Sequence, residues 1–292
     1  MIPGSFEYHH PGSLGEAVDL VARLGDESRV MAGGHSLVPM MKLRLAAPEH
    51  VIDLQDVNEL KGISIDGGTV TIGAMVTQRE IVESAALTAA CSLLRETALQ
   101  IADPQVRYCG TVGGNLANGD AGNDMPAAMQ ALDATYVLAG PGGTREVGSR
   151  DFYHGPYATA RADDEILTAI EFPVPPRRHG AAYFKQKRKI GDYATAAAAV
   201  VLSLSGETCE SAAVSLTNVG DTTLFAEEAG SILAGSRLDA GTIARAADAA
   251  KAIAHPDEDP RGPPDYRRHI AGVMVRRAVE ASRDQALAVT GA

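Results

Sequence analysis

The sequence has no tryptophan, and aromatic residues make up only 4% of its 292 positions. The core must therefore be built mainly from Ala, Val, Leu and Ile, so a single aromatic residue near a site is less readily explained as filler. Cysteine is also rare. Cys91, Cys109 and Cys209 form no CxxC or CxxH pair, which excludes a disulfide framework and a cysteine-held zinc or iron–sulfur site. We expect any redox cofactor to be organic.

Long apolar runs and a surplus of positive charge are absent as well. No window approaches 18 uninterrupted apolar residues, and the start MIPGSFEYHH has neither a basic nor an apolar leader region. We therefore predict a cytoplasmic protein without a transmembrane segment, with a peripheral position at the inner face of the membrane left open. The 26 Lys and Arg against 37 Asp and Glu give a net charge of −11, which argues against nucleic acid as a partner.

The remaining composition, 45% hydrophobic and 22% charged, is typical of a globular chain of about two domains. Strands and helices occur in groups rather than in regular alternation, which predicts an α+β fold. Strands are expected at 29–32, 50–54, 62–65, 69–73, 134–139, 144–147, 165–174, 182–189, 194–204 and 210–219. Helices are expected at 14–24, 37–45, 78–84, 87–100, 125–132, 224–234, 240–253 and 265–286.

A proline cluster, Pro173 with Pro175-Pro176, marks the expected domain boundary. We predict a first domain at 1–176, with subdomains of about 1–54 and 55–176, and a second domain at 177–292. The segment 103–123 is rich in glycine and is predicted to be irregular, and its length favours a functional role.

Two glycine pairs stand out. Gly33 and Gly34, within Ala32–Ser36, follow a predicted strand and precede a predicted helix. There, backbone amides can approach a phosphate closely, because no Cβ is in the way. Thr111–Asn115 offers a second pair, flanked by a hydroxyl and an amide side chain. Either segment alone is more often a plain turn, but the two together suit a diphosphate held between two backbone walls. The chain has no GxxxxGK[ST] and no GxGxxG, which argues against a P-loop NTPase and a Rossmann dehydrogenase.

Four longer segments carry a resemblance to a known family: AGGHSLVPMMKLRLA, IADPQVRYCGTVGGN, NGDAGNDMPA and KRKIGDYATAAAAV. They resemble the FAD-binding medium subunits of molybdenum hydroxylases, above all those of the carbon monoxide dehydrogenases. The resemblance extends over essentially the whole chain. It implies an FAD domain of the vanillyl-alcohol-oxidase type with two α+β subdomains, followed by a C-terminal domain with a three-stranded sheet and helices.

The resemblance also implies which residues bind FAD. The two glycine segments would enclose the diphosphate, His35 through its backbone amide rather than as an acid or base. Ile101 would pack on the flavin ring and Tyr193 would lie over it, Lys185 would lie near its pyrimidine edge, and Asp124 and Leu167 would contact the hydroxyls, adenine or ring. The full set is Ala32, Gly33, Gly34, His35, Ser36, Ile101, Thr111, Val112, Gly113, Gly114, Asn115, Asp124, Leu167, Lys185 and Tyr193. No catalytic residue and no metal ligand is expected.

Residue chemistry alone favours plainer roles for some of these positions. Ile101 would be helix core, and Asp124 a solvated loop charge or the cap of the helix at 125–132. Lys185 would be a charged strand edge beside Lys187–Lys189. For Tyr193, a place over a cofactor ring competes with core packing.

The resemblance further implies an oxidoreductase subunit that passes electrons from iron–sulfur clusters to a quinone or similar acceptor. The molybdopterin and the [2Fe-2S] clusters would belong to a large molybdenum subunit and a small iron–sulfur subunit, in a dimer of heterotrimers. Carbon monoxide is the expected substrate. Two alternatives remain open at this stage: a related hydroxylase acting on a purine, aldehyde or N-heterocycle, and a nucleotide-binding module that transfers no electrons.

Overall fold

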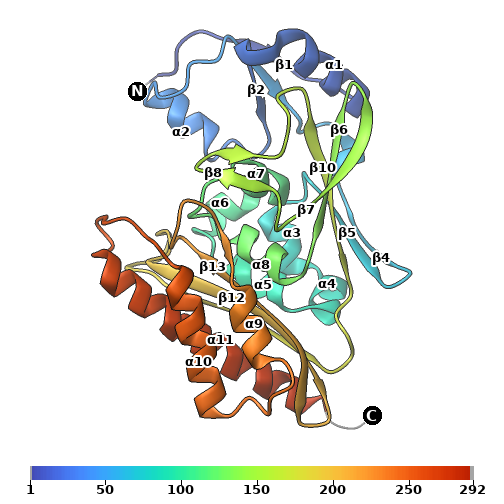
Figure 1. Cartoon of the computed structure of the whole chain (residues 1–292). Coiled ribbons are helices and arrows are strands. Elements are labelled where there is room, and N and C mark those ends of the chain that lie inside the picture. Colours follow the sequence, from blue (N-terminus) through green and yellow to red (C-terminus); the bar gives the residue numbers. More distant parts are fainter. Residues whose placement is uncertain (1, 290–292) are drawn as a thin grey trace.

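The N-terminal part of the chain forms a parallel sheet in the order β1-β3-β2, at the top of Figure 1. The computed structural model describes residues 2–289. The first helix begins where predicted, because the hydroxyl of Ser13 accepts the N–H of Glu16, and it ends at Leu24, just before Gly25, whose φ is +50°. The helix expected at 37–45 is shorter, since Arg44 has a positive φ of 59°. The elements are β1 (Glu7–His9), α1 (Leu14–Leu24), β2 (Ser28–Met31), α2 (Leu37–Lys42) and β3 (His50–Asp53).

A five-stranded antiparallel sheet follows, in the order β4-β5-β10-β6-β7. The two predicted hairpins are confirmed, and β10 lies between them, with Ile170 opposite both Ile72 and Tyr136. A further small hairpin, β8 with β9, was not predicted. The strands are β4 (Ile63–Asp66), β5 (Thr69–Gly73), β6 (Thr135–Gly140), β7 (Gly143–Gly148), β8 (Tyr153–Gly155), β9 (Ala158–Thr159) and β10 (Ile166–Pro173).

The connection from β5 to β6 contains six short helices, and two predictions about it are wrong. The helix expected at 87–100 is interrupted at Cys91 and Ser92. The segment 103–123 is largely ordered into two helices, because the side chains of Asp103 and Thr111 cap them. The helices are α3 (Gln78–Glu83), α4 (Ala85–Ala90), α5 (Leu93–Gln100), α6 (Pro104–Cys109), α7 (Val112–Ala117) and α8 (Met125–Ala131).

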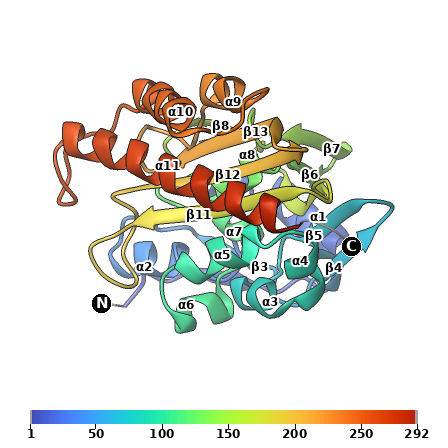
Figure 2. The ribbon, with the colours of Figure 1, turned by 90° about the horizontal axis from the view of Figure 1, so that it is seen from below.

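The C-terminal part consists of an antiparallel sheet, β11-β12-β13-β14, with three helices along one face (Figure 2). The three expected strands are present. A fourth strand of two residues occupies the start of the helix expected at 224–234, so the helix itself begins at Glu227. The elements are β11 (His179–Gln186), β12 (Ala196–Ser205), β13 (Thr208–Thr217), β14 (Leu224–Phe225), α9 (Glu227–Leu233), α10 (Ala240–Ile253) and α11 (Pro264–Ala288).

The alanine-rich strand β12 is buried on both faces. Its side chains alternate: Ala198 and Val200 join the core beneath α9–α11, whereas Ala197 and Ala199 join the core that contains α5 and α8. Small side chains allow helices to pack closely on both sides. At Gly180 in β11 the approach of α11 is closest, so an added Cβ would clash with the backbone there. The C-terminal sheet therefore packs directly against α5 and α8, whose ends carry Ile101 and Asp124 of the site described next.

Residues 174–178 connect the last strand of the five-stranded sheet to the first strand of the C-terminal sheet. Within residues 2–289, no helix combines the length and the apolar character needed to cross a membrane.

Candidate functional site

A cavity of about 700 Å³ lies where β2 ends, between the N-terminal part of the chain and helix α7. This volume lies in the range of small-molecule and cofactor sites. Segments far apart in sequence meet there, including the end of β11 and the loop that follows it. All of the predicted site residues line the cavity except Val112, which is fully buried in the core.

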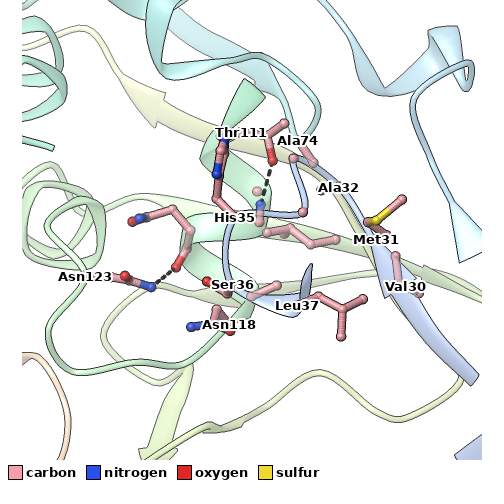
Figure 3. Close-up of a pocket in the computed structure, with 18 of the residues that line it drawn as sticks. Val30, Met31, Ala32, His35, Ser36, Leu37, Ala74, Thr111, Asn118 and Asn123 are labelled. Carbon is pink, nitrogen blue, oxygen red and sulfur yellow. Dashed lines mark hydrogen bonds between the residues drawn. The ribbon is translucent and has the colours of Figure 1, made fainter. Parts of the chain in front are cut away.

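The first glycine segment connects β2 to α2 and has unused hydrogen-bond donors. Within residues 2–289, the backbone N–H groups of Gly33, Gly34, His35 and Ser36 make no hydrogen bond. Gly34 has a φ of +69°, which favours glycine at this position. In Figure 3, this segment, with Ala32, His35 and Ser36, lies next to Thr111 and Ala74. Four consecutive free amides beside a cavity are suited to bind an anionic group such as a phosphate.

The second glycine segment has a different structure from the one predicted. It is the start of helix α7, and the backbone amides of Val112–Asn115 are already used. Val112 donates to the carbonyl of Val76 and Gly113 to that of Ala74, both at 2.9 Å, and Gly114 donates to the Thr111 hydroxyl oxygen at 3.0 Å. What remains available to a ligand is the backbone N–H and the hydroxyl proton of Thr111 and the side-chain amide of Asn115, rather than a row of free backbone amides.

The glycines of both segments are also required by packing. A Cβ at Gly33 would lie 2.1 Å from the carbonyl oxygen of Cys109, and a Cβ at Gly113 would lie 2.5 Å from the Cβ of Ala74. At Gly114, the nearest atom would be the Thr111 hydroxyl oxygen at 2.9 Å. These glycines therefore allow the walls of the cavity to approach one another, whether or not a ligand is bound.

A buried network of charges lies at the other side of the cavity. The Nζ of Lys185 donates to Oδ2 of Asp124 at 2.7 Å and to the carbonyl of Gln100 at 3.3 Å. The Tyr183 hydroxyl donates to Oδ1 of Asp124 at 2.6 Å. Burial raises the pKa of Asp124, while the ammonium and the two hydrogen bonds favour its charged form. Asp124 occupies the N-cap position of α8, but its side chain makes no capping bond there.

Lys187 extends this positive region. Its Nζ also donates to the carbonyl of Gln100, at 3.4 Å, so two ammonium groups converge on one oxygen. Burial and the neighbouring charge of Lys185 lower the pKa of Lys187. Lys187 does not line the cavity, and Lys185 is paired with Asp124, so the free amides of the first glycine segment remain the part of the site best suited to an anionic group.

Apolar and aromatic side chains provide the remaining surface. Ile101 and Leu167 line the cavity and also belong to the main core, so Ile101 is a core residue that also faces the cavity. Tyr193 is 42% exposed, and its hydroxyl donates to Oδ2 of Asp120 at 3.2 Å. Its ring lies close to Gly122, where an added Cβ would be 2.7 Å from Cδ1. Burial and the Asp120 carboxylate raise the pKa of Tyr193, which keeps its hydroxyl protonated.

Gln78 is a residue that the sequence analysis missed. It lines the cavity at the start of α3, and its Nε2 donates to the carbonyl of Thr111 at 3.3 Å. Its buried Oε1 has no hydrogen-bond partner within the described residues. A buried acceptor without a donor is costly, so a ligand that supplies an N–H or O–H would be stabilised here. The capping box of α3, Thr77 with Glu80, gave the position of the helix but no sign of this role.

The chain matches two known protein families. Residues 4–175 match the family described as the FAD binding domain in molybdopterin dehydrogenase. The chain belongs to this family. Residues 181–282 match a second family, the CO dehydrogenase flavoprotein C-terminal domain.

Individual relatives match along nearly the whole chain. The carbon monoxide dehydrogenase medium chain of Afipia carboxidovorans is 57% identical over 98% of this chain and 99% of its own length. That of Hydrogenophaga pseudoflava is 48% identical over 97% and 98%. A chain in the crystal structure of Cu,Mo-CO dehydrogenase in its cyanide-inactivated form superposes with a TM-score of 0.96 and 56% identity, covering 98% of this chain and all of that chain.

The chemical groups that line the cavity of this chain fit those of FAD. The free amides of the first glycine segment and the Thr111 hydroxyl suit a diphosphate, the unpaired Oε1 of Gln78 suits a hydroxyl or amino donor, and Ile101 and Tyr193 offer surfaces for a planar ring. FAD is the cofactor of this subunit, and its α+β fold is that of the FAD-binding domain with the flavoprotein C-terminal domain.

Proposed function

We propose that this chain is the FAD-carrying medium subunit of a molybdenum hydroxylase that oxidises carbon monoxide, CO + H2O giving CO2, two protons and two electrons. The observation that supports this most is the likeness along the whole chain to two carbon monoxide dehydrogenase medium chains. Electrons would arrive from iron–sulfur clusters on a partner and leave to a quinone or similar acceptor. The assembly would contain a large molybdenum subunit and a small iron–sulfur subunit, as a dimer of heterotrimers in the cytoplasm.

The cysteine content supports the assignment of the iron–sulfur clusters to a partner subunit. A [2Fe-2S] cluster held by cysteines alone takes four of them, and this chain has only three. Two of them, Cys91 and Cys209, are buried, and Cys109 is exposed. We therefore assign the clusters, like the molybdopterin, to partner subunits.

Within this subunit, the residues bind the cofactor and adjust its electrostatic surroundings. The amides of Gly33–Ser36 and the Thr111 hydroxyl would hold the diphosphate, and Tyr193 and Ile101 would cover the ring. Lys185 would stabilise negative charge on the ring. Asp124 would determine how strongly the positive charge of Lys185 acts on the ring. When bound, FAD supplies redox chemistry that accepts and releases electrons without a protein nucleophile or base. We also propose the division into domains at 1–176 and 177–292.

Reconstitution of the complex tests the proposal. The chain is produced with and without the large and small subunits, and carbon monoxide-dependent reduction of a quinone analogue is measured. We expect no turnover by the isolated chain, no quinone reduction by a complex without this chain, and restored reduction once the flavin-loaded chain is added. Carbon monoxide oxidation by the isolated chain would contradict the proposal, as would a chain whose addition changes nothing.

The same experiment distinguishes the alternatives. If the complex reduces its flavin with a purine, an aldehyde or an N-heterocycle but not with carbon monoxide, this chain serves a related hydroxylase. If the bound flavin stays oxidised with every substrate that reduces the iron–sulfur clusters, the chain is a nucleotide-binding module without electron transfer.

A further inference from the structure

A cluster of two histidines and a glutamate lies outside the flavin cavity, on the N-terminal parallel sheet. Glu7 and His9 belong to β1, and His50 begins the neighbouring strand β3. The pairing places Glu7 opposite His50, and His9 follows two positions later on the same face of β1. The sheet itself therefore holds the three side chains together, rather than a flexible loop.

The ligand atoms of these side chains are close to one another. The Nε2 of His9 lies 3.0 Å from the Nδ1 of His50, and the Oε2 of Glu7 lies 3.3 Å from that Nδ1 and 4.0 Å from the Nε2. A tetrahedral ion with bonds of about 2.0–2.1 Å holds its ligand atoms about 3.3–3.4 Å apart. The three separations bracket this value, so small side-chain shifts would complete the geometry.

The surroundings of the cluster are acidic. Ligand atoms of Glu27 and Glu49 lie within 4.8 Å of each other and of a ligand atom of His50. Within residues 2–289, the ion pairs of Glu7 are with His9 and His50, and no Lys or Arg pairs with Glu27 or Glu49. Carboxylates beside a ligating imidazole hold it in the tautomer that a metal needs and raise its basicity.

We propose that Glu7, His9 and His50 form a binding site for a divalent cation of the zinc type. Two imidazole nitrogens and one carboxylate oxygen are a ligand set that suits Zn²⁺ and leaves a fourth position for water. At present, one of the two rings donates its N–H to the other. On metal binding, the donor ring moves that proton to its second nitrogen, so that each ring presents a lone pair to the ion.

The expected consequence is a stronger attachment of the first strand. β1 has only three residues and lies at an edge of the sheet, and the ion would connect it to the central strand β3. Because the site requires both strands to be paired, the cation binds the folded chain and raises its melting temperature as the metal concentration rises. This inference is independent of the flavin and of the proposed redox function.

Zinc binding to the full-length, tag-free chain tests the site. After chelator treatment, the chain is titrated with ZnCl2 in competition with a chromogenic chelator. We expect one high-affinity equivalent, together with an increase in melting temperature. His9→Ala, His50→Ala and Glu7→Gln should each weaken binding by at least about tenfold, and Glu49→Gln by less than any of these three.

His10→Ala is the matched control. His10 is adjacent in sequence, is 40% exposed and pairs with Asp56 instead of the cluster, so its loss should leave zinc binding unchanged. Far-ultraviolet circular dichroism and FAD content, compared among the variants without metal, check that each is folded. The site is refuted if the wild-type chain binds no zinc at micromolar concentration, or if His9→Ala and His50→Ala bind as tightly as His10→Ala. Loss of binding in Glu49→Gln but not in Glu7→Gln would refute the assigned ligand set.

Discussion

The Nζ of Lys185 lies 2.7 Å from the Oδ2 of Asp124, and the two side chains are only 2% and 6% exposed. The Tyr183 hydroxyl fixes the second oxygen of the same carboxylate. Two opposite charges are therefore buried as a pair beside the cavity. The field that Lys185 exerts on a ligand is reduced by its partner, so the pair and not the lysine alone determines the local potential.

Removal of one member of this pair should destabilise the chain. In Lys185→Met, the Asp124 carboxylate stays buried without its cation, which typically costs about 3–5 kcal/mol. The double variant Lys185→Met/Asp124→Asn should regain most of this loss, because no unpaired charge remains. Urea unfolding of the three chains at neutral pH measures the difference, and equal stability of the two variants would contradict this account.

The stability loss in Lys185→Met should depend on pH. Burial already raises the pKa of Asp124 in the folded chain, and removal of Lys185 takes away the largest influence that lowers it. A group whose folded-state pKa is raised contributes stability below its unfolded pKa and loses it as the pH rises through the folded value. The difference from wild type should therefore be small near pH 3, below the unfolded pKa of about 3.9, where the carboxyl is mostly neutral in the folded and in the unfolded chain, and it should grow towards neutral pH. Unfolding at a series of pH values tests this sign.

The same two residues should shift the potential of bound flavin in opposite directions. Lys185→Met removes a cation and should lower the midpoint potential, whereas Asp124→Asn leaves the ammonium uncompensated and should raise it. We expect each change to be on the order of tens of millivolts, given that about 30 mV corresponds to 1.4 kcal/mol for two electrons. Lys187→Met is the control for loss of a neighbouring positive charge that does not line the cavity. Shifts of the same sign in both variants would show that the pair does not act on the ring.

This pair also shows what could not be predicted from the sequence. Asp124 and Lys185 are 61 positions apart, and no local pattern indicates that they meet. Their selection came from a family resemblance, and residue chemistry alone favoured a helix cap and a strand edge. Gln78 was missed for a related reason, since a buried glutamine without a partner is recognisable only once its surroundings are known.

Local signals predicted the fold more reliably. Helix α10 has the predicted bounds, with Asp239 capping its first turn, and the paired hairpins follow from alternating strands around glycine turns. The glycines of the segment 103–123 predict an irregular structure, although Asp103 before Pro104 is a strong helix start. In that segment, tertiary packing against Ala74 and Val76 determines the structure, and glycine marks close approach rather than disorder.

Gly33 should be required for folding as well as for flavin binding. An added Cβ would lie 2.1 Å from the carbonyl oxygen of Cys109, so Gly33→Ala must displace backbone and should cost about 1–3 kcal/mol or more. Gly15→Ala is the control, because a Cβ there meets nothing within 4 Å in helix α1, and it should be neutral or slightly stabilising. Urea unfolding without FAD measures both. If Gly33→Ala loses flavin while keeping full stability, the glycine serves the ligand alone.

Tyr193 should contribute to flavin binding mainly through its ring. Tyr193→Ala removes the aromatic surface beside Gly122 and should weaken FAD binding by about 1–3 kcal/mol, while the diphosphate contacts remain. Tyr193→Phe keeps the ring and loses only the 3.2 Å hydrogen bond to Asp120, so its effect should be well below that of the alanine variant. Tyr157→Phe, which removes the 3.4 Å hydrogen bond to the same carboxylate oxygen, separates the role of Asp120 from that of the ring. FAD titrations of the three variants decide the matter: if Tyr193→Phe binds as weakly as Tyr193→Ala, the hydroxyl and its contact with Asp120 carry the interaction, and the ring does not cover the flavin.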